Sequence, residues 1–384
     1  MKKILVILTG GTIGSKISLK DINVDSNAAY SLISRYQECY EKETEFEVLS
    51  PYQVLSENMD LEYWMKLYET LCGISYSDYE GVIITHGSDT LAYTSNFIGY
   101  LFGKTPIPMI LIASNYALTH PKSNGLLNFK TSIDFIKEKK GKGVFTIFSN
   151  HKDEVPVYRA TNVKEADPYL DRFSPFDGTY YDVKKGDYWL SELEKEEGLQ
   201  EKKNTLEETK IDEAQIEETK IGETQIEETK IEKTEIRETK IEEIKIGEIA
   251  KEEADKNFIL FENQLNLKKR VLGIRVYPGL DFDVYDLSKV NVVLCYLYHS
   301  ATASVEGNNT SILNFIHKCK EKGIQVFVAS FKSGEAGGYV TKQEILKAGA
   351  IPLYDLSYES AYMKLLIGIN QTQTDLCRWM KEIS

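Results

Sequence analysis

Hydroxyl and carboxylate side chains follow two apolar segments of the sequence directly. The motif TGGTIGS (residues 9–15) comes after residues 4–8, and the motif THGSDT (residues 85–90) comes after residues 81–84. Short apolar runs bounded by glycine are typical of buried parallel strands, whose carboxyl ends share one edge of a sheet. Hydroxyl groups beside a carboxylate can form a nucleophile and its proton network. The two motifs together therefore predict a site at this edge.

The glycine loop does not match the common nucleotide-binding motifs. It lacks the Gly-Lys-Ser/Thr ending of a phosphate-binding P-loop and does not match Gly-x-Gly-x-x-Gly. For this loop alone, the alternative is that Thr9 and Thr12 only satisfy loop backbone groups. Asp89 is also placed to cap the helix expected around Leu91 to Leu101.

The pair of motifs resembles the bacterial L-asparaginase family, type I or asparaginase I-like. The similarity extends over residues 1 to about 180 and from about 257 to 370, with an insertion between. It implies an α/β fold with a larger N-terminal parallel-sheet domain and a smaller C-terminal α/β domain. We expect an asparaginase-like domain at 1–185, a charged pentad-repeat linker at 186–256 and a second asparaginase-like domain at 257–384.

The resemblance implies a catalytic group of Thr12, Ser88, Asp89 and Lys164. Thr12 would attack the amide carbonyl, release ammonia and form a β-aspartyl ester, while the other three would form the proton network. Aligning Tyr158-Arg159 with the family's Tyr-Arg leaves Lys164 one residue short of the usual spacing. The alternative for Lys164 is a surface ion pair with a neighbouring acid, which is worth little energetically.

Substrate-binding positions are also implied by the resemblance, and some of them depart from the family pattern. Glu57 stands where the family has Gln, Asn124 replaces an Asp, and Ser88 stands where Thr is more frequent. Tyr30 is the nearest candidate for the tyrosine of the family's mobile lid. For Ser56 and Glu57 the alternative is simple helix capping. The implied substrate-binding residues are Gly11, Ser56, Glu57, Gly87 and Ser114.

Composition fits a two-domain enzyme of 384 residues, 42% of them hydrophobic. The five cysteines lack C-x-x-C spacing and the five histidines form no ligand cluster, so we expect no metal and no cofactor. No signal peptide is expected, and no apolar run approaches the length of a membrane span. These features predict a cytoplasmic protein that binds neither membrane nor nucleic acid.

The net charge of −13 is concentrated in the insertion. Residues 191–256 hold 23 acidic and 12 basic side chains, a balance of −11, which leaves −2 elsewhere. From Ile211 to Ile246 an isoleucine recurs every fifth residue, a period that fits neither helix nor strand. This favours a disordered or transiently helical linker. The alternative is a short pentapeptide-repeat β-solenoid.

The sequence thus predicts hydrolysis of L-asparagine to L-aspartate and ammonia by a homodimer or homotetramer. The segment Glu306 to Asn309 would complete a neighbouring protomer's site, as the resemblance implies. Two alternatives stay open. The first alternative is a non-catalytic asparaginase-like module that binds an amino acid or a partner. The second is an amidase or an amidotransferase subunit that acts on another small amide.

Overall fold

The computed structural model describes residues 2–11, 13, 15–17, 22–24, 26–150, 155–182, 187–189, 265–334, 338–371 and 375–382. Contacts divide the chain into two compact units, Met1–Asp187 with Phe258–Ser384, and Tyr188–Asn257. Thr12 and the pentad repeat lie outside the described residues, so the predictions about them stay predictions.

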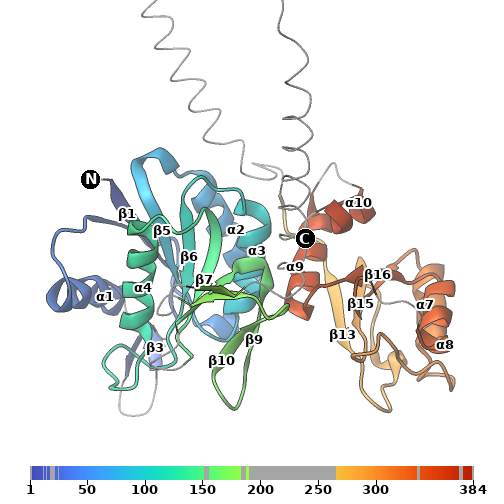
Figure 1. Cartoon of the computed structure of the whole chain (residues 1–384). Coiled ribbons are helices and arrows are strands. Elements are labelled where there is room, and N and C mark those ends of the chain that lie inside the picture. Colours follow the sequence, from blue (N-terminus) through green and yellow to red (C-terminus); the bar gives the residue numbers. More distant parts are fainter. Residues whose placement is uncertain are drawn as a thin grey trace, which may run out of the picture. The chain divides into compact units, whose positions relative to one another are not determined.

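The larger sheet has the strand order β12-β11-β8-β7-β6-β5-β1-β4 (Figure 1). Strands β4, β1, β5, β6 and β7 are parallel, whereas β8 is antiparallel to β7 and β11 to β8. The elements of this part are β1 (Lys3–Leu8), β2 (Ser15–Ile17), β3 (Ile22–Val24), α1 (Ser26–Cys39), β4 (Phe46–Leu49), η2 (Ser56–Asn58), α2 (Leu61–Cys72), η3 (Tyr76–Asp78), β5 (Tyr79–Thr85), α3 (Leu91–Phe102), β6 (Pro108–Ile112), α4 (Gly125–Lys137), β7 (Gly143–Ile147), β8 (Pro156–Arg159), η4 (Ala160–Asn162), β9 (Val163–Asp167), β10 (Arg172–Pro175), β11 (Tyr180–Asp182) and β12 (Asp187–Trp189).

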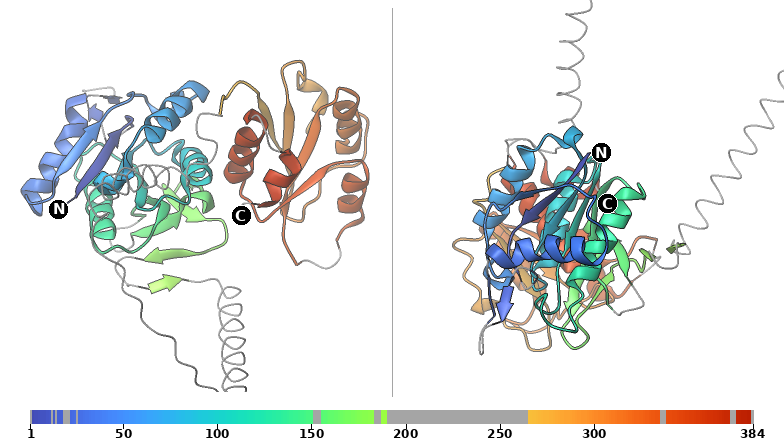
Figure 2. Two further views of the ribbon diagram at one scale, coloured as in Figure 1. Left: turned by 90° about the horizontal axis from the view of Figure 1, so that it is seen from above. Right: turned by 90° about the vertical axis from the view of Figure 1, so that its left-hand side faces the viewer.

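Helices cover both faces of this sheet, which explains why its strands are continuous apolar runs. Helices α1 and α4 lie on one face of the sheet, and α2 and α3 lie on the other (Figures 1 and 2). Along β1, Ile4, Val6 and Leu8 pack in the cluster that includes α1 and α4, while Leu5 and Ile7 pack in the cluster that includes α2 and α3. The parallel pairing of β1 with β5 brings Leu8 opposite Thr85. The two chemistry-bearing motifs therefore begin side by side, as the sequence predicts.

The smaller sheet is fully parallel, with the order β13-β14-β15-β16. Helix α7 ends where Gly323 adopts a positive φ of 71°, a conformation that favours glycine. The elements of this part are β13 (Val271–Arg275), η6 (Phe282–Val284), β14 (Val292–Tyr296), α7 (Ile312–Glu321), β15 (Gln325–Phe331), α8 (Val340–Lys347), β16 (Ile351–Tyr354), α9 (Tyr358–Asn370) and α10 (Leu376–Glu382). Two parallel-sheet domains of unequal size confirm the predicted fold class.

Helix α9 of the smaller domain packs against α3 and β9 of the larger one. Tyr100 on α3 and Ser360 on α9 share a buried hydrogen bond, and Ser360 Oγ also donates to the carbonyl of Thr161. Within the described residues no helix is long and apolar enough to cross a membrane.

Candidate active site

Three backbone segments meet at the carboxyl ends of β1 and β5 with almost no space between them. Gly11 has a φ of +77°, and a Cβ atom there would lie 2.4 Å from the backbone nitrogen of Gly87. A Cβ atom at Gly87 would in turn lie 2.3 Å from Ser56 Oγ. Glycine is required at both positions for this close approach. The glycines of the two motifs thus bring Ser56 onto the loop that carries Ser88 and Asp89.

Ser56 holds the loop of the second motif in two ways. Its hydroxyl donates to Asp89 Oδ2 at 3.2 Å, and its carbonyl accepts from Thr90 Oγ1 at 2.9 Å. Asp89 is exposed, whereas Ser56 is buried. The prediction that Asp89 caps α3 is wrong, because Thr90 is the N-cap residue and the Asp89 carboxylate is turned to Ser56 instead.

His86 is buried beneath this loop and fixes its shape. Its Nδ1 donates to the carbonyl of Gly87 at 2.8 Å, and its Nε2 accepts from Thr94 Oγ1 at 3.0 Å. Trp64 Nε1 donates to the same Thr94 hydroxyl at 2.9 Å. Burial lowers the pKa of His86 to about 4, although the Gly87 carbonyl and the charge of Asp89 oppose that shift. His86 is therefore a neutral positioning group at neutral pH.

A pocket of about 350 Å³ opens beside Ser88 and Asp89. Its walls come from the ends of β5, β6 and β7 and from the β9–β10 hairpin. The lining residues are Ser88, Asp89, Asn115, Phe148, Glu165, Ala166, Asp167, Pro168, Asp171 and Phe173. Ligands of open α/β sheets bind at this strand end, so the pocket is the candidate active site.

The structure gathers most of the residues that the sequence singles out for this site. Gly87 lies against both Gly11 and Ser56, and Ser88 and Asp89 line the pocket. The remaining predicted residues are placed differently, and their roles stay predictions.

Glu57 is exposed on η2. The Ser114 hydroxyl, fully buried, donates to the carbonyl of Tyr116 within its turn. Lys164 is half-buried on β9 and is not among the residues that line the pocket, whereas its neighbour Glu165 is.

Strand β9 contains a β-bulge directly after Lys164. Ser174 of β10 pairs with Lys164, but Arg172 pairs with Asp167, so β9 has one extra residue between these pairs. Glu165 lies in this bulge and lines the pocket. Sequence reasoning missed Glu165 as a site residue. The available signal was the spacing after Tyr158-Arg159. At the usual distance from this pair the residue is Glu165, because Lys164 comes one position earlier.

Asn124 has a structural role that an aspartate cannot fill. Its Oδ1 accepts from the backbone nitrogen of Asn115 at 3.0 Å, and its Nδ2 donates to the carbonyl of Ser149 at 2.9 Å. Asn115 Oδ1 accepts from the Asn124 nitrogen in return. Because a carboxylate has no donor, the departure from the family pattern at Asn124 is matched to these partners. The paired amides position Asn115, which lines the pocket.

No group of three or more His, Cys, Asp and Glu side chains that could hold a metal ion occurs in the part of the chain that the structure describes.

Comparison with known proteins shows which sequences and folds this chain is similar to. Residues 3–188 match the sequence model of the family described as "Asparaginase, N-terminal". A curated relative from Metallosphaera sedula, one of the subunits of a glutamyl-tRNA(Gln) amidotransferase, is 30% identical over 136 residues, which are 35% of this chain and 31% of the relative. The chain thus spans about a third of the length of the curated relatives it matches.

Two solved structures share the fold over nearly their whole length. The thermostable L-asparaginase from Thermococcus kodakarensis superposes with a TM-score of 0.65 at 21% identity, covering 99% of this chain and 97% of that one. L-asparaginase I from Vibrio cholerae gives 0.65 at 20% identity, covering 100% and 98%. The chain therefore has an asparaginase-like fold, and its N-terminal half carries the sequence signature of that family.

Proposed function

We propose that the protein hydrolyses L-asparagine to L-aspartate and ammonia. The observation that supports this proposal best is the orientation of Asp89. Ser56 holds its carboxylate beside Ser88 at the mouth of a pocket, at the ends of two adjacent parallel strands. These groups lie inside the segment that matches the asparaginase N-terminal family.

In the proposed mechanism Thr12 attacks the side-chain amide carbonyl, ammonia leaves, and water hydrolyses the resulting β-aspartyl ester. Ser88 and Asp89 carry the proton to and from the nucleophile and the water. Lys164 is the proposed cationic member of this network. The backbone nitrogen of Gly87 is the proposed donor where the oxyanion develops, whereas the Gly11 nitrogen donates to the Val54 carbonyl at 3.1 Å.

A coupled ammonia-release assay on the purified protein tests this function directly. With L-asparagine the wild type should release ammonia, and Thr12→Ala should remove nearly all of that activity while L-aspartate still binds. Calorimetric titration with L-aspartate measures the binding that remains. Ammonia release retained in the Thr12→Ala variant would remove Thr12 from the role of nucleophile.

A second candidate function comes from the curated relatives, whose name describes one component of an amidotransferase. Under this alternative the pocket releases ammonia from another amide, such as L-glutamine, and passes it on. Comparing initial rates on L-asparagine and L-glutamine separates the two. A protein inert towards both that still binds L-aspartate would be the non-catalytic binding module. Cytoplasmic location and assembly into a homodimer or homotetramer are parts of the first proposal.

A further inference from the structure

A second pocket lies at the edge of the larger sheet opposite to the candidate active site. It has a volume of about 450 Å³ and is bordered by the amino ends of β5 and β6 and by the loop between α4 and β7 (Figure 1). Pockets of this size hold small molecules. Since β5 has seven residues and a strand rises about 3.3 Å per residue, roughly 20 Å separates the two pockets.

The floor of this second pocket is apolar. Tyr79 at the start of β5 and Ile136 on α4 are buried, and Ile107 before β6 is half-buried. Pro106 and Pro108 flank Ile107, and their rings fix the backbone on both sides of it. A ligand with an apolar body would cover Ile107 and remove apolar surface from water, which favours binding.

The rim of the pocket is basic. Lys2, Lys139 and Lys142 line it, and Glu80 is the single acidic residue among the lining residues. The pocket therefore has three positive charges against one negative charge. In the part of the chain that the structure describes, none of these three lysines forms an ion pair.

Nearby acids are paired with lysines outside the pocket. Lys3 pairs with Glu47 at 3.7 Å. Lys140 pairs with Glu138 at 3.3 Å. Each of these two lysines is the chain neighbour of a lysine that lines the pocket. An anion from solution would neutralise the charge that these acids leave uncompensated.

Lys139 has a backbone conformation that favours glycine. Its φ is +53°, and the backbone nitrogens of residues 139 and 140 donate to the carbonyls of Ile136 and Phe135. After α7 the same two bonds form around Gly323, whose φ is +71°. A lysine after α4 is less stable than a glycine there. A side chain placed at such a cost is expected to have a function.

We propose that this pocket binds a small organic anion with an apolar body. The anionic head lies among Lys2, Lys139 and Lys142, and the apolar body covers Ile107 and Ile136. A carboxylate on a short hydrocarbon chain has both features. The inference does not depend on the proposed function, because the pocket lies at the other edge of the sheet.

Calorimetric titration of the full-length protein tests the ligand class with octanoate as the probe. Octanoate should bind about 10-fold or more tightly than octanol, since each exposed lysine contributes a factor of about 2 to 5. Hexanoate and butanoate should bind more weakly, by about fourfold for each buried methylene lost. Raising NaCl from about 20 to about 500 mM should weaken octanoate and not octanol. Undetectable octanoate binding, equal affinity for octanol, or no dependence on chain length would overturn the proposal.

Two charge changes at the rim should have opposite effects. Lys142→Met should weaken octanoate binding about 2- to 5-fold, the range for one exposed charge pair. Glu80→Gln should tighten it by a similar factor, because it removes the single negative charge of the pocket. Lys318→Met is the matched control, since Lys318 is exposed on α7 of the smaller domain and should not change the affinity. Equal affinities in all three variants would contradict the proposal.

Lys139→Gly separates binding from folding. The substitution should raise the melting temperature by about 2 °C, because glycine adopts the positive φ without strain, and should weaken octanoate binding. Gly323→Lys is the reverse change after α7 and should lower the melting temperature while octanoate binding stays the same. A Lys139→Gly variant that is more stable and binds octanoate as well as wild type would show that Lys139 has no part in the pocket.

Two further measurements check where the anion binds and what carries it. Saturating L-aspartate should not displace octanoate, whereas competition would place octanoate in the candidate active site and overturn the inference. A lipid headgroup is also an anion on an apolar body, so the protein is sedimented with vesicles of dioleoylphosphatidylglycerol. We expect it to stay in solution. Sedimentation with the vesicles that Lys139→Gly abolishes would show that the lysines bind a membrane surface rather than a small ligand.

Discussion

His86 offers a quantitative test of how the candidate site is built. In His86→Asn the new amide can still donate to the Gly87 carbonyl, as Nδ1 does now at 2.8 Å, but it cannot titrate. The Thr94 hydroxyl loses its acceptor, since Nε2 is gone. At pH 7 we expect the variant to be less stable by about 1–3 kcal/mol, the cost of an unsatisfied buried polar group.

The stability that His86 contributes at neutral pH should be lost on acidification. Burial holds the pKa of His86 at about 4 in the folded chain, against 6.5 as the ordinary value. Between these pH values the unfolded chain binds a proton at His86 and the folded chain does not, so acidification favours unfolding. The stability that His86 contributes is fully present above pH 6.5 and is lost as the pH falls towards 4. A pKa difference of about 2.5 corresponds to about 3.4 kcal/mol.

Urea unfolding at pH 7 and pH 4.5 measures both effects. Wild type should lose about 2–3 kcal/mol more than His86→Asn between these two pH values, because only wild type has this buried imidazole to protonate. His317→Asn is the matched control, since His317 is exposed on α7. If wild type and His86→Asn lose stability in parallel on acidification, His86 is not held neutral, and the argument that it fixes the Ser88 and Asp89 loop fails with it.

Three further predictions concern other positions. Lys164→Met should lower turnover of L-asparagine by about 10² or more while the fold survives. Near-normal steady-state rates would show that Lys164 is not part of the site, and Glu165 would then be the charged side chain that β9 contributes to the pocket. Asn124→Asp should cost about 1–3 kcal/mol at pH 7, because a carboxylate oxygen would face the Ser149 carbonyl that Nδ2 now contacts at 2.9 Å. Thermal unfolding measures this cost, which protonation at low pH should reduce. Deleting Glu201 to Lys251 and joining the ends with a short flexible linker should leave melting temperature and specific activity nearly unchanged, and a large drop in either would show that the repeat is structural.

The sequence predicts the central strands well because burial on both faces leaves a clear pattern. Residues 4–8 and 81–84 lie in β1 and β5, and the apolar runs 106–112 and 143–148 contain β6 and β7. In the smaller domain, β13, β14 and β15 occur where the apolar runs indicate. Glycine spacing also indicates where the two motifs meet, since Gly11 and Gly87 tolerate no side chain at their point of contact.

Roles that depend on distant partners could not be predicted. Nothing in the motif THGSDT shows that its histidine is buried, because the partners Thr94 and Trp64 come from α3 and α2. Asp89 has the residue type and position of a helix cap, yet Ser56, 33 residues earlier, competes for its carboxylate. The sequence shows that Asp89 could either cap α3 or accept a hydrogen bond from Ser56. The packing of the two loops against each other decides between these two hydrogen bonds.

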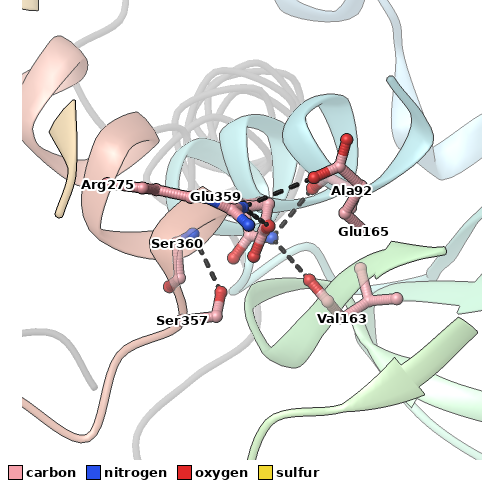
Figure 3. Close-up of polar contacts among 8 residues, drawn as sticks. Ala92, Val163, Glu165, Arg275, Ser357, Glu359 and Ser360 are labelled. Atoms are coloured by element: carbon pink, nitrogen blue, oxygen red, sulfur yellow. Dashed lines mark hydrogen bonds and ion pairs between the residues drawn. The ribbon is translucent and has the colours of Figure 1, made fainter. Parts of the chain in front are cut away.

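The bulge in β9 determines which of two adjacent charged side chains serves the pocket. Val163 is fully buried, and its carbonyl accepts from Asn96 Nδ2 at 3.0 Å, which anchors the start of the strand to α3 (Figure 3). At the other end, Asp167 accepts from the nitrogens of residues 169 and 170 and fixes the turn. With both ends fixed, the extra residue can only be accommodated between them, in the bulge that contains Glu165. Lys164 could reach the position of Glu165 only if β9 moved by one residue. That shift would take Val163 out of the core and break its hydrogen bond to Asn96. The folded state would lose buried apolar area and gain an unsatisfied carbonyl, and both changes are destabilising. The position of a bulge cannot be read from the spacing of residues along the chain. The sequence alone therefore points to Lys164, whereas in the structure Glu165 lines the pocket.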